Sequence, residues 1–138
     1  MANEALISAV KEIVALAKNG DSDGAYVGYC ALFGGPEFST YRPEDQRQAL
    51  KLMVLAKGAP DKPTPAMVDA HRAALGPLTE LVSAHGEPSD HELLGVCHVV
   101  LGNEESASNI FKAGLAIERE RDPSSVLCGA LMKRVSML

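Results

Sequence analysis

Apolar residues recur at intervals of three and four along most of the chain, which is the period of an amphipathic α-helix. The first such stretch runs from Leu6 to Ala17 and predicts a helix over about residues 3–19. The same pattern predicts further helices over about residues 24–33, from Pro43 to a stop at Gly58, over 65–83, 89–101 and 103–121, and from Asp122-Pro123 to Leu138. The pattern therefore predicts an all-α protein.

Residues 88–123 carry the clearest start and stop signals. Ser89 followed by Glu92 has the spacing of a capping box, in which each side chain binds a free backbone N–H at the start of a helix. Gly102 is placed to end that helix, and Asn103 to begin the next one. The stretch is expected to form two helices joined by a tight turn.

Two other segments leave alternatives open. Residues 34–42 (GGPEFSTYR) predict a loop, either plain surface with Phe38 or Tyr41 turned inward, or a cover over one edge of a groove. Gly76-Pro77 falls inside the helix expected over 65–83, where a proline removes a backbone donor and predicts a kink or a break.

Small and aromatic residues of the 88–123 stretch follow a known spacing. They are Leu94-Gly95, Gly102, Ala107, Phe111 and Gly114. In this respect the stretch resembles a tetratricopeptide repeat (TPR), although His91 and His98 stand where that motif has a large aromatic and a tyrosine. The resemblance implies two antiparallel helices that approach closely at the small residues, with Phe111 filling the space between one hairpin and the next.

The resemblance implies a fold for the whole chain. We expect one domain over residues 1–138, a TPR-like α-solenoid of stacked antiparallel helical hairpins with a C-terminal capping helix over Phe111. The hairpins are expected at about 3–33, 43–83 and 89–121, and the capping helix at about 123–138. Gly20, Gly58 and Gly102 lie 38 and 44 residues apart, whereas a regular array repeats at about 34, so the array is expected to be irregular.

Composition narrows the class of protein. A net charge of −5 and the lack of a Lys/Arg cluster argue against a nucleic-acid surface. No apolar run is long enough to span a bilayer, and the N-terminal stretch lacks the layout of a signal peptide. Three cysteines cannot form a closed disulfide framework. These observations predict a soluble, cytoplasmic protein with reduced thiols and no membrane contact.

Residues with catalytic or metal-binding potential are scattered. Asp90-His91-Glu92 and Cys97-His98 put several ligand types within nine residues, but no Cys-x-x-Cys or His-Glu-x-x-His spacing occurs. Cys30, Cys97 and Cys128 fall on apolar helix faces and are expected to be buried, inert thiols. We therefore expect no enzyme, no cofactor and no metal.

The first helices of stacked hairpins line a concave side that can hold a peptide. By the TPR pattern, the groove-facing positions of the last hairpin are Ser89, Glu92, Val96 and Val99. These residues favour an apolar or amphipathic segment of a partner protein, as a scaffold would bind. The alternative is that Val96 and Val99 are covered by the chain's own helix over 65–83.

Two other functions stay open at this point. Small acidic TPR proteins serve as dedicated chaperones for a secretion or assembly partner, and this chain is similar in size and charge. A structural homodimer is the third possibility, and it would use exposed apolar helix faces such as Tyr26, Tyr29 and Phe33.

Overall fold

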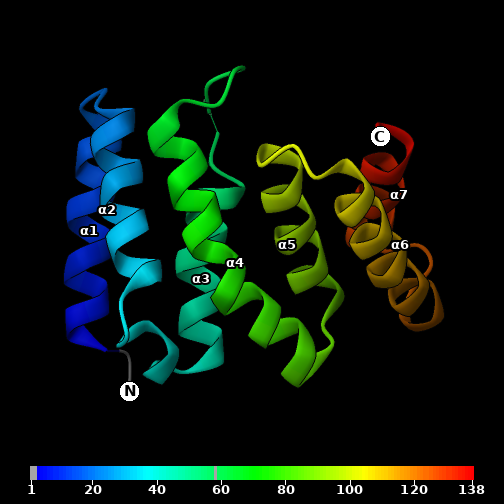
Figure 1. Ribbon diagram of the computed structural model, residues 1–138. Helices are drawn as coiled ribbons and strands as arrows, with labels where there is room; N and C mark the ends of the chain where they lie inside the picture. The colour runs from blue at the N-terminus through cyan, green and yellow to red at the C-terminus, as the bar shows by residue number, and fades with distance from the viewer. Residues whose placement is uncertain (1–2, 58) are drawn as a thin grey trace. The chain divides into compact units, whose positions relative to one another are not determined.

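The computed structural model describes residues 3–57 and 59–138, and within them every regular element is helical (Figure 1). The prediction of an all-α fold is confirmed. The elements are α1 (Glu4–Lys18), α2 (Ser22–Gly34), the short 3-10 helix η1 (Phe38–Thr40), α3 (Pro43–Val54), α4 (Pro65–His85), α5 (Pro88–Val100), α6 (Glu104–Arg121) and α7 (Val126–Ser136).

The bounds predicted for α1, α4 and α6 agree with the structure to within two residues. Asp21 caps α2 by accepting a hydrogen bond from the backbone N–H of Gly24 at 2.9 Å. α3 ends at Val54, and the predicted stop at Gly58 lies outside the described residues. α4 runs without a break through Pro77 to His85. The sequence predicted a kink or a break at this proline, and of the two the break is absent.

The predicted starts of α5 and α7 are wrong. α5 begins at Pro88 after Glu87, with no side-chain cap, because a proline at the first helical position needs no donor and already has the helical φ angle. Ser89 thus lies inside the helix rather than before it. Asp122 instead ends α6 and accepts hydrogen bonds from Ser124, which turns the chain before α7.

The serine that caps a helix in this part of the chain is Ser125. Its Oγ accepts a hydrogen bond from the backbone N–H of Cys128 at 2.9 Å and donates one to Glu118 Oε2 at 2.7 Å. Ser125→Ala is expected to lower the free energy of unfolding by about 1 kcal/mol because an N-cap is lost. Ser89→Ala is the matched control and should change it by less than about 0.5 kcal/mol. Urea unfolding of both variants measures this, and equal losses would contradict the assigned cap.

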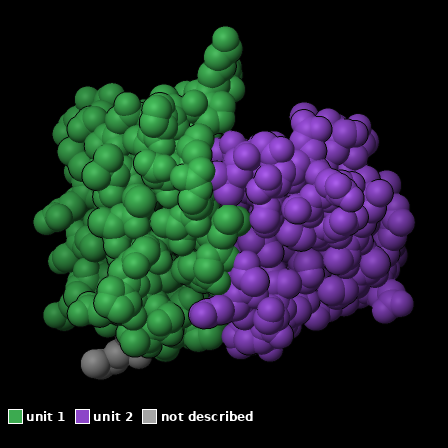
Figure 2. Space-filling view, viewed as in Figure 1, with its two compact units in different colours: residues 1–77 green, residues 78–138 purple. Residues whose placement is uncertain are grey.

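The chain divides into two compact units, Met1–Pro77 and Leu78–Leu138, which are called unit 1 and unit 2 (Figure 2). In unit 1, α1 and α2 pack side by side as a hairpin (Figure 1). Gly28 makes the close approach possible, since a Cβ there would lie 2.7 Å from Ile13 Cγ1. α2 also meets the start of α4: Thr64, which precedes α4, donates from its Oγ1 to Asp23 Oδ1 of α2 at 2.8 Å.

Aromatic rings fill the core of unit 1. Tyr29 stacks on Phe33, Phe33 meets Phe38 edge to face, and Phe38 meets Tyr41 in the same way, with ring centroids 5.6, 5.1 and 5.9 Å apart. Phe38 is buried, as one alternative for the 34–42 loop expected. Tyr26, Tyr29 and Phe33 are buried too. The prediction that these three residues form an exposed face for a homodimer is therefore wrong.

Unit 2 is built on the α5–α6 hairpin, with α7 packed on α6. Gly102 has φ +81° in the turn between α5 and α6, a conformation that favours glycine. A Cβ on Gly95 would collide with the Phe111 ring, and a Cβ on Gly114 would lie 2.6 Å from His91 Cβ. The close approach of the two helices at small residues is confirmed.

A second core joins α6 to α7. Its buried members are Ala107, Phe111, Leu115, Cys128 and Leu131, with Val96, Leu127 and Val135 packed against them. Within the described part of the chain, no helix has both the length and the apolar character that crossing a membrane requires.

Candidate functional site: an apolar hollow between α1 and α3

The four residues predicted to form a groove differ in how far they are exposed to solvent. Ser89 and Val99 are exposed. Glu92 is buried and accepts a hydrogen bond from Arg134 Nε of α7 at 2.7 Å. Val96 is partly buried against the core that contains Phe111. Contacts within unit 2 therefore engage Glu92 and Val96, and Ser89 and Val99 stay open to solvent.

Arg134 holds α7 against both α5 and α6. Besides the ion pair with Glu92, its guanidinium lies 5.9 Å from the centroid of the Phe111 ring, within the range of a cation–π contact. The partner of Glu92 is thus a residue of α7.

Unit 1 contains a hollow that the sequence did not indicate. It has a volume of about 200 Å³ and lies between α1 and α3. Its apolar lining comes from both helices and consists of Leu6, Ile7, Val10, Ala49 and Leu52. Ile7 is 41% exposed and Leu52 is 48% exposed, so both side chains are within reach of another molecule.

The hollow continues along α3. Two further depressions, of about 550 and 360 Å³, share Leu52 with the first and extend past the end of α3 to Lys57. One of them is walled on the other side by Val14, Ala17 and Tyr26. Leu52 is thus the common point of a continuous apolar surface, which we call the α1–α3 hollow.

Cationic side chains surround this hollow. They are Lys11 and Lys18 of α1, Lys51 of α3 and Lys57 just beyond it. All four are exposed, and none forms an ion pair with another described residue.

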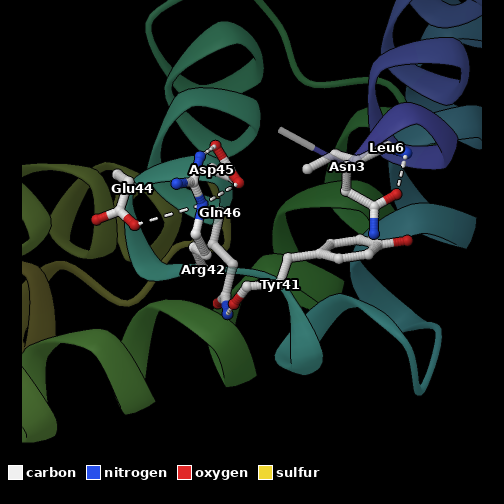
Figure 3. A network of polar contacts seen from close by, with 7 residues as sticks. All are labelled: Asn3, Leu6, Tyr41, Arg42, Glu44, Asp45 and Gln46. Atoms are coloured by element: carbon white, nitrogen blue, oxygen red, sulfur yellow. Dashed lines mark hydrogen bonds and ion pairs between the residues drawn. The ribbon is translucent and has the colours of Figure 1, made fainter. Parts of the chain in front are cut away.

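The single carboxylate in the lining, Asp45, is already engaged. Arg42 Nε and Nη2 donate to it at 3.0 and 3.3 Å, and Glu44 lies 3.7 Å from the same guanidinium (Figure 3). At the same end of the hollow, Asn3 caps α1 by accepting from the Leu6 N–H at 3.2 Å (Figure 3). The free charge around the hollow is therefore positive.

One sequence signal could have found this site. The buried stripe of α3 runs through Gln46, Ala49, Leu50 and Met53. Leu52 lies outside that stripe, so the burial of α3 in the core does not account for an apolar side chain at this position. That α1 and α3 line the same hollow could be seen only in the structure.

Side chains that could bind a metal or act as nucleophiles lie outside this hollow. Among the described residues, no three His, Cys, Asp or Glu side chains gather as a metal site would require. The cysteines are free thiols, and Cys97 and Cys128 are buried as expected, whereas Cys30 is partly exposed. Burial raises the pKa of the Cys97 thiol to about 12, so it stays protonated and unreactive at neutral pH.

His71 of α4 is a buried titratable group. Its Nδ1 lies 2.7 Å from the Met67 carbonyl oxygen, and burial lowers its pKa below the ordinary value of 6.5. The folded protein therefore binds this proton less readily than the unfolded chain does. The contribution of neutral His71 to stability is fully present above pH 6.5, and it is expected to be lost as the pH falls through the window below that value.

Replacement of His71 should remove this pH dependence. His71→Gln is expected to flatten the plot of unfolding free energy against pH below 6.5, relative to the wild type. His98, whose pKa burial also lowers, contributes in the same direction, so His98→Gln is the companion variant. Urea titrations at several pH values measure the slopes. A slope unchanged in the double variant would contradict the assignment.

No family model, curated protein or solved structure matches this chain.

Proposed function

We propose that this chain is a non-enzymatic protein-binding module whose site is the α1–α3 hollow. The observation that carries the proposal is a continuous apolar surface with Leu52, half exposed, at its centre. An exposed apolar surface is costly in water unless a partner covers it, and such surfaces mark interaction sites.

The position of the hollow supports a TPR-like arrangement within unit 1. α1 and α3 are each the first helix of an expected hairpin, and first helices line the concave side of stacked hairpins. The close α5–α6 crossing at Gly95 and Gly114 supports the same assignment in unit 2. There we propose that α7 acts as a capping helix, because it covers Phe111.

Paired capture experiments test this function. The wild-type chain, Leu52→Asp and Val99→Asp are immobilised and exposed to a native lysate. Val99 is 41% exposed on α5 and is the matched control, since both variants add one carboxylate in place of a half-exposed aliphatic side chain. Circular dichroism first verifies that both variants are folded.

The expected result is a specific protein that the wild type and Val99→Asp retain and Leu52→Asp loses. Loss with Val99→Asp alone would move the site to the exposed part of α5. A protein that Leu52→Asp binds as well as the wild type does would overturn the assignment to the hollow. If the captured protein is unstable without this chain, the module acts as a dedicated chaperone rather than a reversible scaffold.

A further inference from the structure

We infer that the α1–α3 hollow selects an acidic amphipathic helix as its partner: a helix with an apolar stripe flanked by Asp or Glu on both edges. This inference rests on the proposed function of the hollow and adds the chemistry of the partner.

The positive charge at the hollow is not a reflection of overall composition. The chain has a net charge of −5, and unit 1 alone has nine acidic and eight basic residues. Four of the five lysines of unit 1 nevertheless line the hollow, and the fifth is Lys62. With Asp45 engaged by Arg42, a partner in the hollow meets unpaired ammonium groups.

These lysines stand on both walls. Lys11 and Lys18 are seven residues apart on α1, which puts them on one side of the helix roughly 10 Å from each other. Lys51 and Lys57 stand on and just beyond α3, on the other side of the apolar surface. A helix lying between the walls would offer carboxylates to both if acidic residues recur every two turns along each edge of its apolar stripe.

The length of the hollow agrees with such a partner. From Asp45 to Val54 the lining follows α3 over roughly 14 Å at the helical rise, and it continues past the end of the helix to Lys57. A helix of about ten residues or more spans that length. Apolar contact would supply most of the affinity, and the lysines would supply selectivity and a faster association.

A displayed library of randomised peptides, each about 16 residues long, tests the inference without a known ligand. The immobilised full chain is the bait, and selected peptides are made synthetically with a fluorescent label for anisotropy titrations. The expected sequences have Leu, Ile or Phe at helical spacing with Asp or Glu on both flanks. Their affinity should fall as salt rises, because exposed charge pairs are screened.

Charge reversal on both walls is the decisive variant. Lys11→Glu combined with Lys51→Glu should lower the affinity for the selected peptides by about tenfold or more at low salt. Lys62→Glu is the matched control and should leave the affinity unchanged. All three lysines are exposed, so the variants are expected to fold.

Failure of each proposal has its own signature. Suppose that the selected peptides lack acidic flanks, and that Leu52→Asp weakens their binding but the double lysine variant does not. This result would overturn the acidic partner and leave the hollow as a binding site. Selected peptides that bind Leu52→Asp as tightly as the wild type would overturn the hollow itself. A selection that yields no binding peptide would also count against the hollow as a peptide site.

Discussion

Replacement of Gly95 by leucine is expected to lower the free energy of unfolding by about 1–3 kcal/mol. A Cβ at this position already collides with the Phe111 ring, which is itself buried in the α6–α7 core. A leucine side chain must therefore push α6 away from α5 or force Phe111 out of its position. Urea unfolding of the variant measures the loss.

Alanine provides a sharper form of the same test. In an open helical position, Gly→Ala stabilises by roughly 0.5–1 kcal/mol because alanine restricts the unfolded chain. Gly129 of α7 is such a position, since a Cβ there meets nothing within 4 Å. Gly95→Ala should destabilise while Gly129→Ala should not. Stabilisation by both changes would show that α5 and α6 do not cross closely at Gly95.

Phe111→Ala is expected to cost about 3–5 kcal/mol, the largest effect of any substitution considered for this chain. The ring is buried, packs with Cys128 and Leu131 of α7, and lies beneath Arg134. Its removal would leave a cavity between α6 and α7. Thermal and urea unfolding measure the loss.

Val126→Ala is the control for this prediction. Val126 lies on α7 and is 92% exposed, so its truncation should change stability by less than about 0.5 kcal/mol. A loss below about 1 kcal/mol for Phe111→Ala would mean that the ring is not a core residue. The packing of α7 on α6 would then be wrong as well.

The helices themselves could be predicted from the sequence because their signals are local. The apolar period, Pro43, Pro65 and Gly102 fixed most boundaries to within a few residues. The small residues Gly95 and Gly114 also indicated where α5 and α6 cross. The cap at Ser125 was missed because Asp122-Pro123 offers a competing start signal that the turn at Ser124 displaces.

The candidate site could not be predicted in the same way. The four groove positions came from a spacing pattern, and that pattern does not show that Arg134 lies against Glu92 or that Val96 lies against the Phe111 core. The α1–α3 hollow depends on two helices about 40 residues apart being neighbours, with Leu52 and Ile7 left uncovered. Such gaps arise from the shapes of packed helices, which periodicity does not encode.

The ion pair between Glu92 and Arg134 also makes the helices α5 and α6 depend on α7. Its two residues are 42 positions apart in the chain, and Arg134 lies on α7. A chain cut in the turn between α6 and α7, at residues 122–125, would lose both the cation that pairs with Glu92 and the helix that covers Phe111. Partly folded chains that expose apolar surface are prone to aggregate, so such a cut is expected to turn unit 2 into an aggregation-prone species.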